Sequence, residues 1–403
     1  MNKSHIYYGI AIVLGVVAGL LNIPFINTIS KTCSEIFIRM FKCISMPIVS
    51  LSILIALSCY GAGENTKTIW KKTLFYTSFT TLLAASVAAI LYSIVSPPSV
   101  TIAASDITNQ VMQQNSGDYL KYFLEIIPDS ISKAFMEHKV LSVLLISAIF
   151  GLAIRSINES EVKSTIINFF KGLHSVFFFI TNFLVKILPI GLFGFISVSI
   201  TEINSGFDFK GMGKYFLVII LANLVQGIVI LPTILAAKRI NPLNTFKGMA
   251  PALSVAFFSK SSSGALPVTI QSAENNLKIN PRVSKFVLPL CTTINMNGCA
   301  AFIFSTVIYM MQNNGLQIDF LTIITWVLIS TLAAIGNAGV PMGCFFLSAS
   351  LLSSMNVPIE LLGITLPFYS VLDMLETSLN VWSDSCVATI VNKQVSNDNT
   401  QNC

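Results

Sequence analysis

Long apolar segments follow one another along the whole chain, and their lengths predict helices that cross a membrane. An α-helix rises by about 1.5 Å per residue, so about 20 apolar residues span a bilayer. Segments of this kind lie near residues 5–24, 34–60, 69–96, 139–157, 161–200 and 209–238. We expect an all-α polytopic membrane protein whose first apolar segment is a span and not a cleaved signal peptide.

From residue 243 onward, polar or Gly/Pro-rich sequence interrupts the apolar segments, as in "SKSSSGALP" from 259 and "GNAGVPMG" from 336. Helices broken at membrane depth are tolerated only where protein or a water-filled cavity satisfies the freed backbone groups. We expect two repeats of a re-entrant hairpin followed by a broken helix: 243–277 with 281–313, and 318–355 with 358–394. Eight transmembrane helices plus two re-entrant helical hairpins are typical of a secondary transporter whose site lies between the hairpins.

Composition and charge agree with a lipid environment. The chain of 403 residues is 54% hydrophobic and 10% charged, with a mean hydropathy of +0.75, whereas soluble domains carry about 25% charged residues. Its net charge of +6 is divided among short loops rather than gathered on one face, which argues against a nucleic-acid partner. Thirteen Lys and Arg residues fall in the predicted inner loops and three, Lys31, Lys210 and Lys214, in the outer loops. This distribution predicts cytoplasmic termini in a cell membrane, such as the bacterial inner membrane.

Cysteine and histidine give no sign of cofactor chemistry. The eight cysteines contain no C-x-x-C pair and lie mostly in apolar sequence, so we expect buried packing residues rather than disulfides or metal ligands. The three histidines are far apart in the sequence. We therefore expect no cofactor.

Polar residues cluster in the last apolar segment, "VLDMLETSLNVWSDS", where Asp373, Glu376, Thr377, Asn380 and Asp384 recur with helical spacing. This spacing places all five on one side of a helix. A stripe of satisfied interhelical hydrogen bonds would explain the pattern, but each acid costs about 2.5–3.5 kcal/mol to insert. That cost favours a binding site.

A second polar group comes from "CTTINMNGC", where Asn295 and Asn297 precede Gly298, which weakens a helix. Unwound backbone, Asn side chains and the Asp384 carboxylate offer the oxygen ligands that an alkali cation prefers, although a packing kink would give the same sequence. The hairpin tips offer unpaired N–H groups that suit a carboxylate, and Pro341 ends helical bonding in the second tip.

Four motifs in order, "SKSSSGALPVT", "LPLCTTINMNG", "AAIGNAGVP" and "LDMLETSLNVWSD", resemble the signatures of the dicarboxylate/amino acid:cation symporter family, the glutamate-transporter fold. The resemblance covers nearly the whole chain. It implies a homotrimer in which a transport part moves across the lipid bilayer, like an elevator, against a fixed scaffold. The implied division is 1–68 (scaffold spans 1 and 2), 69–98 (span 3, transport part), 99–208 (scaffold spans 4 and 5), 209–395 (transport part) and a polar tail at 396–403.

The resemblance also implies site residues. Asp373 would hold the substrate α-amino group, and Asn380 would hold the α-carboxylate together with the serine tip. The implied substrate-binding residues are Ser261, Ser262, Ser263, Cys299, Gly339, Val340, Asp373, Glu376, Thr377 and Asn380. The implied cation-binding residues are Tyr76, Thr80, Cys291, Thr293, Asn295, Asn297, Ala334, Ile335, Asn337, Asn380 and Asp384, with Na⁺ at Asn295, Asn380 and Asp384.

Departures from the family pattern bear on the substrate. Members that carry acidic substrates have Arg at the position of Glu376, where a guanidinium pairs with the distal carboxylate. Glu376 reverses that charge, and Cys299 replaces a Thr near the substrate side chain. Lys260 could partly neutralise Glu376 or Asp373. Glutamate, aspartate and C4 dicarboxylates are therefore expected to be poor substrates.

Glu376 allows two interpretations. It would accept hydrogen bonds from a small hydroxylated or amide side chain, as the serine/threonine branch of the family suggests, or it would pair with a basic amino acid. We favour neutral polar substrates, because a carboxyl group beside Asp373 is expected to hold a proton when the site is empty. The same argument allows proton coupling in place of Na⁺.

A deep sodium site of the family is expected to be weak here. Asn297 stands where acidic-substrate members have Asp, and Phe79 is placed at a ligand position beside Tyr76 and Thr80. The Asp384 site would then be the principal one.

Three other functions are weaker. Two hairpins that close over acids favour an occluding site over a channel, an intramembrane aspartyl protease would need a GxGD-type motif, and a structural protein has little use for five polar groups on one face. The sequence thus predicts a symporter of an amino acid with Na⁺ or H⁺ and no enzymatic chemistry.

Overall fold

The computed structural model describes residues 3–58, 64–99, 127–137, 140–204, 210–337, 339, 342–355, 357–358 and 360–401. Helices joined by short connections make up this part of the chain, and none of it forms a strand. The expectation of an all-α protein is confirmed for the described residues.

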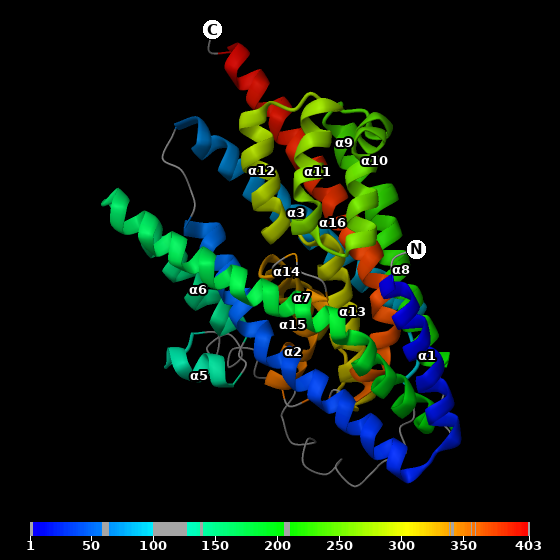
Figure 1. Ribbon diagram of the computed structural model, residues 1–403. Helices are drawn as coiled ribbons and strands as arrows, with labels where there is room; N and C mark the ends of the chain where they lie inside the picture. Colours follow the sequence, from blue (N-terminus) through cyan, green and yellow to red (C-terminus); the bar gives the residue numbers. More distant parts are fainter. Residues whose placement is uncertain are drawn as a thin grey trace.

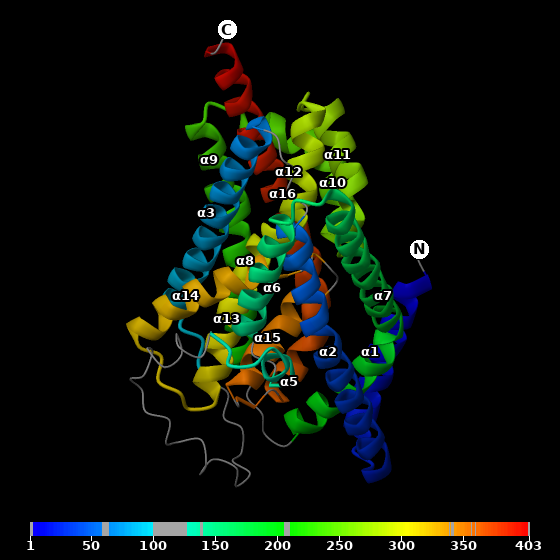
Figure 2. The same cartoon turned by 90° about the vertical axis from the view of Figure 1, so that its left-hand side faces the viewer.

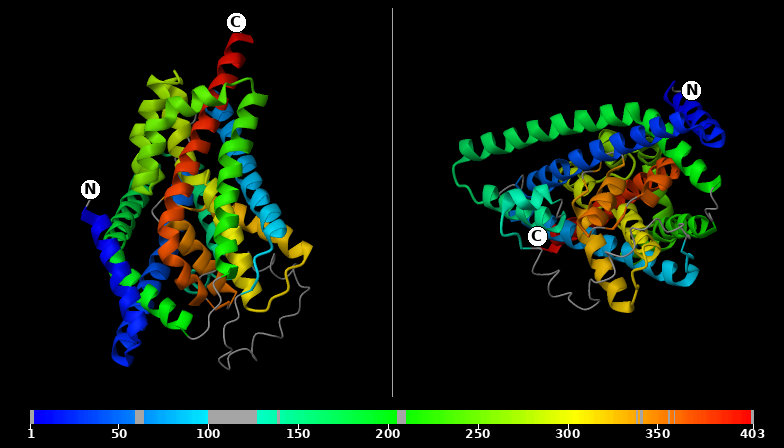
Figure 3. Two further views of the ribbon diagram at one scale, coloured as in Figure 1. Left: turned by 90° about the vertical axis from the view of Figure 1, so that its right-hand side faces the viewer. Right: turned by 90° about the horizontal axis from the view of Figure 1, so that it is seen from below.

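Four helices from the first half of the chain pack together: α1 (Lys3–Leu21), α2 (Pro24–Ser58), α6 (Val140–Arg155) and α7 (Ser160–Asn204). The long helices α2 and α7 lie side by side along one edge of the molecule (Figures 1 and 3). Small residues allow this approach, because a Cβ atom on Gly194 would lie 2.6 Å from the Ser30 carbonyl oxygen. The Ser30 hydroxyl donates to the Ser197 hydroxyl across the same contact at 2.9 Å.

Helix α3 (Glu64–Val95) packs against a rod made of α8 (Lys210–Val225), the π-helical turn η1 (Gln226–Ile230) and α9 (Leu231–Ala237). The Gln226 side-chain amide donates to the Thr80 carbonyl oxygen at 3.0 Å, so the π turn contacts the middle of α3. Turns of this kind inside α-helices often mark functional sites.

The first expected hairpin is present, with its two helices packed on each other, whereas the two helices of the second expected hairpin pack on other helices of the fold rather than closely on each other. The first consists of α10 (Pro242–Ser259) and α11 (Ser262–Asn275), and the second of α14 (Phe320–Ile335) and α15 (Gly343–Ser354). Lys260 ends α10 in the left-handed region at φ 55°, and Ser261 caps α11 by accepting from the Gly264 N–H at 3.0 Å. The serine run is therefore a tight connection between two helices rather than a flexible linker.

The helix expected at 281–313 is broken into α12 (Pro281–Ile294) and α13 (Asn297–Asn313). The break falls at Asn295 and Met296, whose φ/ψ angles of −109°/70° and −107°/68° are not helical. Gly298, in contrast, lies inside the first turn of α13. Its small size serves a close contact, because a Cβ atom there would lie 2.8 Å from the Cα atom of Glu376.

Helix α16 (Glu360–Gln401) carries the acidic motif and runs the length of the molecule, orange to red in Figure 2. The helix is continuous, so the break expected within 358–394 is wrong. It continues through most of the segment 396–403 that the sequence suggested was a polar tail. The sequence also missed the short helix α5 (Ile131–Met136), and α2 begins ten residues before the expected span at 34. These differences lie at helix ends or in loops, where patterns of hydrophobicity are weakest.

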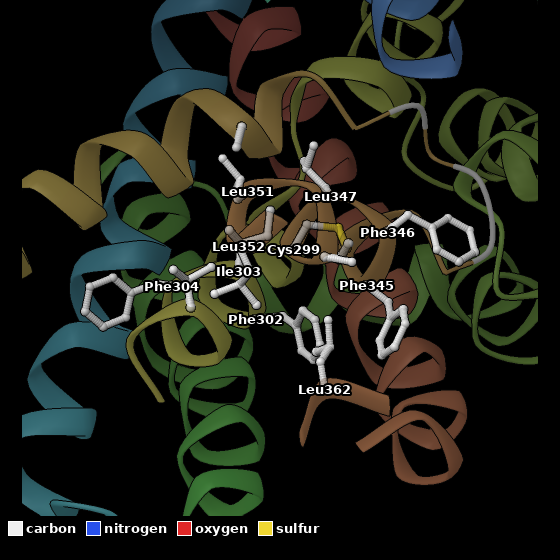
Figure 4. Packing of buried hydrophobic residues seen from close by; sticks show 14 of the residues in the cluster. Cys299, Phe302, Ile303, Phe304, Phe345, Phe346, Leu347, Leu351, Leu352 and Leu362 are labelled. Atoms are coloured by element: carbon white, nitrogen blue, oxygen red, sulfur yellow. A yellow bond between two sulfur atoms is a disulfide. The ribbon is translucent and has the colours of Figure 1, made fainter. Parts of the chain in front are cut away.

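Helix α13 forms the centre of the fold. Every residue from Asn297 to Met311 is buried, and Phe302 packs against Tyr369 of α16 with ring centroids 4.5 Å apart. Figure 4 shows Phe302 and Ile303 beside side chains of α15, whereas Phe304 lies on the side of α3, where its ring packs against Tyr92. An element surrounded on all sides is a rigid support for whatever its first turn holds.

Among the described residues, three stretches are long and apolar enough to cross a membrane: Thr68–Val95, Gly211–Ala237 and Pro281–Asn313. Shorter apolar helices include Ser142–Arg155 and Phe320–Ile335. The total of eight spans and the division into scaffold and transport parts remain predictions.

The contact at Gly298 gives a test of the fold. We expect Gly298→Ala to lower the unfolding free energy by about 1–3 kcal/mol, because the added methyl group would overlap the α16 backbone. The matched control is Gly213→Ala in α8, where a Cβ atom meets nothing within 4 Å and where Ala should stabilise by about 0.4–1 kcal/mol. Thermal unfolding in detergent measures both. Equal midpoints for the two variants would contradict the close approach of α13 and α16.

Candidate substrate and cation site

The polar stripe predicted on the last helix exists on α16 and faces the interior. Asp373, Glu376, Thr377, Asn380 and Asp384 are all buried, with at most 5% of their surface exposed. The Asn380 side-chain oxygen accepts from the Gly298 N–H at 2.8 Å, so the stripe faces the first turn of α13. Buried polar groups at this density require partners, and the broken helix supplies them.

The C-terminal part of the stripe, around Asp384, meets the helix break in a network of amides. The Asn295 side-chain amide donates to the Asp384 carboxylate at 2.9 Å and to the Ser383 hydroxyl at 3.0 Å. The Asn295 oxygen accepts from the Thr80 hydroxyl at 3.1 Å and from the Asn297 amide at 3.4 Å, and Asn297 also donates to Ser383. Helices α3, α13 and α16 and the break thus meet at one point.

Oxygen atoms around this network are left without hydrogen bonds. Asp384 Oδ2 and Asn297 Oδ1 are buried and have no donor in the described part of the chain, and the same holds for Asn223 Oδ1 and Gln226 Oε1 on the neighbouring rod. A buried carboxylate oxygen without a donor costs several kcal/mol unless a cation binds it. Carboxylate and amide oxygens are the ligands that hard cations prefer. We call Thr80, Asn295, Asn297, Ser383 and Asp384 the cation cluster.

The N-terminal part of the stripe, at Asp373 and Glu376, meets the start of α15. Asp373 Oδ2 accepts from the Met342 N–H at 3.1 Å, and the Tyr369 hydroxyl lies 3.4 Å from both Asp373 Oδ1 and Glu376 Oε2. Lys260 from the first tip interacts electrostatically with Asp373, and Thr377 shares a side-chain hydrogen bond with it. Asp373 is therefore compensated from both hairpins, while Glu376 has a single long contact to a hydroxyl.

The two hairpin tips meet beside the helix break. The Ser261 hydroxyl donates to the Gly339 carbonyl oxygen at 3.4 Å. Gly339 has φ +60°, and a Cβ atom there would lie 2.5 Å from the Thr292 carbonyl oxygen and 3.2 Å from Ser263 Oγ. Only glycine fits at this point, both for its backbone angle and for its neighbours. Ser262 is buried in the first turn of α11, directly after Ser261.

Cys299 corrects the expectation that the cysteines are unpaired packing residues. It forms a disulfide with Cys344, the second residue of α15, 45 positions away. The Asn337 side-chain amide donates to both sulfur atoms, at 2.9 Å to Cys299 and 3.2 Å to Cys344. No local sequence motif predicts this disulfide, because it is the packing of α15 on α13 that brings the two residues together (Figure 4).

Other predicted residues lie outside the cation cluster. The Tyr76 hydroxyl accepts from the Gln394 side chain at 2.7 Å, ten residues beyond Asp384 on α16, and so points away from Asn295. Phe79 is 41% exposed and stacks on Phe75, so its side chain does not occupy a ligand position. The Thr293 hydroxyl donates to the Leu290 carbonyl oxygen within α12.

Backbone ligands were expected at several positions. The Cys291 carbonyl oxygen accepts from the Asn295 N–H at 2.8 Å, and the Ala334 carbonyl oxygen accepts from the Asn337 N–H at 3.0 Å. Ile335 ends α14 just before Gly336. Val340 and Pro341 lie outside the described residues.

Sequence analysis missed several polar residues that the structure places in the site. Tyr369 and Ser383 extend the α16 stripe at helical spacing, so a longer search for that pattern would have found them. Asn223 and Gln226 lie on the rod that contains the π turn, and Met342 contributes only its backbone N–H. These last three carry no signal in the sequence that points to Asp373 or Asp384.

The sequence itself was compared with known proteins. Residues 6–394 match the sodium:dicarboxylate symporter family. The chain belongs to this family. The resemblance first seen in four short motifs is thereby confirmed over almost the full length of the protein.

Individual members of the sodium:dicarboxylate symporter family include transporters for different substrates. Human excitatory amino acid transporter 3 is 26% identical over 95% of this chain and 84% of that protein. Neutral amino acid transporter B(0) of Bos taurus is 26% identical over 92% of this chain and 74% of that protein. The proton/sodium-glutamate symport protein of Geobacillus stearothermophilus is 25% identical over 95% and 92%. Such even similarity does not separate acidic from neutral substrates, so the pocket must be considered directly.

The cation cluster leads to a test of stability. We expect Asn295→Ala to lower the unfolding free energy by about 3 kcal/mol or more, because it removes the hydrogen bond to a buried carboxylate. Asn276→Ala is the control, since Asn276 is exposed and donates a single hydrogen bond to the Gly248 carbonyl oxygen. Thermal unfolding in detergent without added sodium compares them. A loss no larger than that of the control would show that Asn295 does not support Asp384.

Proposed function

We propose that this protein is a secondary active symporter that couples the inward movement of a cation, Na⁺ in the first place, to the uptake of an amino acid. Relatives named as a proton/sodium-glutamate symport protein, a neutral amino acid transporter and an excitatory amino acid transporter support this. The observation that carries the proposal is one buried stripe on α16 that contacts both the hairpin region, through Asp373, and the helix break, through Asp384. Two sites on one helix provide the link that symport needs.

Asn380 stands between the two sites. Its side-chain oxygen accepts from the Gly298 N–H at 2.8 Å. Gly298 follows Asn295, the residue that donates to Asp384, by three positions. A cation that draws Asp384 and Asn297 together would fix the break, and with it the first turn of α13. Asn380 would then be oriented for the substrate carboxylate. Coupling of this kind is a shared structural state that both ligands stabilise.

An amino acid backbone is provided for by groups of opposite character. Asp373 is placed to accept from the substrate ammonium group, and Asn380 together with first-turn N–H groups of α11 is placed to donate to the carboxylate. Lys260 and the Met342 N–H hold Asp373 while the hairpins are closed. The substrate ammonium group would replace part of this compensation.

The side-chain end of the pocket contains Glu376, Cys299 and Cys344 within 4.8 Å of one another. Among the described residues, the hydrogen-bond partner of Glu376 is the Tyr369 hydroxyl, and no Arg donates to it. A substrate carboxylate beside Glu376 would be repelled in a desolvated site. We therefore propose a small neutral polar side chain that donates to Glu376, with basic amino acids as the alternative.

For the cation, the cluster of Asn295, Asn297 and Asp384 is the proposed sodium site, completed by Asn380 and backbone carbonyls of the break. The unpaired oxygens Asp384 Oδ2 and Asn297 Oδ1 support this. Asn297 carries no charge where acidic members carry one, which favours weak binding of a second ion. Tyr76, Ala334, Ile335 and Asn337 remain candidates for further ligands.

The family further suggests how the whole molecule works. We propose a homotrimer in the cell membrane, with cytoplasmic termini, eight spans and two re-entrant hairpins. The scaffold would comprise residues 1–68 and 99–208, and the transport part residues 69–98 and 209–395, moving as an elevator. Close packing of α1, α2, α6 and α7 on one another supports a separate scaffold.

Sodium coupling is tested at Asp384. In proteoliposomes, Asp384→Asn should raise the Na⁺ concentration for half-maximal amino acid uptake by at least about tenfold, the factor that corresponds to about 1.4 kcal/mol of lost cation binding. The same exchange at the exposed Asp319, which caps α14, is the control and should leave Na⁺ dependence unchanged. Na⁺ and H⁺ gradients are imposed separately. Uptake that depends on neither gradient would rule out symport.

Substrate preference is tested at Glu376. Glu376→Arg should increase glutamate or aspartate uptake by at least about tenfold relative to a neutral amino acid, because a like charge becomes a bidentate partner. Glu376→Gln separates the two effects, since it removes the charge without adding a guanidinium group. A panel of acidic, neutral and basic amino acids is measured for each protein. Wild-type protein that prefers glutamate over every neutral amino acid would overturn the assignment.

A further inference from the structure

Three side chains that proteins use to bind metals converge at the side-chain end of the pocket. The sulfur atoms of Cys299 and Cys344 and a carboxylate oxygen of Glu376 all lie within 4.8 Å of one another. They come from α13, α15 and α16, and each residue has at most 2% of its surface exposed. Neither the family match nor the names of the relatives accounts for a pair of cysteines facing a carboxylate.

Two further observations indicate that this cluster is built for a ligand. Glu376 Oε1 is buried and has no hydrogen-bond partner among the described residues, and an unpaired buried carboxylate oxygen is costly. The sulfur atoms, in contrast, accept amide hydrogen bonds from Asn337 at 2.9 and 3.2 Å and from Asn380 at 3.5 Å. Donors aimed at sulfur stabilise the thiolate form, which is the form that binds metals.

We propose that the reduced form of this cluster is a binding site for a thiophilic divalent cation of the Zn²⁺ type, with Cys299, Cys344 and Glu376 as ligands. Two thiolates and one carboxylate supply three of the four positions of a tetrahedral site, and the fourth would be taken by water or by the substrate. The soft sulfur ligands distinguish this site from the cation cluster, which offers only hard oxygen ligands and suits Na⁺.

The disulfide must be reduced before the two sulfur atoms can bind a metal ion. A dithiol reductant transfers two electrons and two protons to the Cys299–Cys344 disulfide and is itself oxidised to a disulfide. Each thiol then loses its proton when it binds the metal, so binding releases two protons. Disulfide and metal exclude each other, because both use the same two sulfur atoms.

Bound metal would tie three elements together. Cys344 is on the second hairpin, Cys299 is in the first turn of α13 and Glu376 is on α16. The ion would occupy the position proposed above for the substrate side chain. This inference goes beyond the proposed symport, and it does not depend on that function because metal binding is measured without transport.

Binding is measured with Cd²⁺ on the purified full-length protein, after dithiol reduction and removal of the reductant under argon. The number of free thiols is determined first, and titration calorimetry with parallel metal analysis then gives the stoichiometry and affinity. We expect one tightly bound Cd²⁺ per chain in the reduced protein and at least about 100-fold weaker binding in the oxidised protein, since loss of even an outer-shell partner costs 10–100-fold.

Variants assign the ligands. Cys344→Ser, Cys299→Ser and Glu376→Gln should each weaken Cd²⁺ binding by more than about tenfold, because each removes one ligand. Cys386→Ser, on the same helix as Glu376, and Cys33→Ser on α2 are the controls, since both residues are free cysteines away from the cluster. The nearly isosteric Glu376→Gln and the oxidised wild-type protein keep the test informative if a serine variant does not fold.

Several results would overturn the proposal. Absence of Cd²⁺ binding by the reduced wild-type protein would do so, as would binding that survives in Cys344→Ser or that is lost in Cys386→Ser. Resistance of the disulfide to reduction in the folded protein would also contradict it, because the sulfur atoms would then never be available. None of these outcomes bears on uptake of an amino acid, which is measured separately.

Discussion

The structure depends on how the buried carboxylate of Asp384 is held by a helix that breaks to reach it. The Asn295 side-chain amide donates to Asp384 from the point where Asn295 and Met296 leave the helical conformation between α12 and α13. A continuous helix would present its side chains at regular intervals. The break therefore produces both the polar network and the close contact of α13 with α16.

That one contact organises the elements around it. The Thr80 hydroxyl of α3 reaches Asn295, and the π turn places Gln226 against the Thr80 carbonyl oxygen. Each element thus brings a polar group to a point that would otherwise be apolar, and several of the oxygens there have no donor among the described residues. Natural proteins keep such costly features mainly where a ligand repays them.

Much of this arrangement could be predicted from sequence because it is local. Helical spacing placed Asp373, Asn380 and Asp384 on one face, and interruptions in the apolar segments located the first hairpin and the break between α12 and α13. Long-range features could not be predicted in the same way. The rotation of α3 that turns Phe79 outward and Tyr76 toward Gln394, and the pairing of Cys299 with Cys344, are decided by packing between segments far apart in sequence.

The two acids in the N-terminal part of the stripe, Asp373 and Glu376, differ in their surroundings, and that difference bears on selectivity. Asp373 has the Met342 N–H and the charge of Lys260, so its carboxylate is matched before any substrate arrives. Glu376 has one long contact to Tyr369, and its Oε1 atom has no hydrogen-bond partner among the described residues. A pocket with one compensated and one uncompensated acid selects against anionic side chains and in favour of hydrogen-bond donors or cations, whether amino acid or metal. The identity of the side chain that satisfies Glu376 therefore determines what this site can hold.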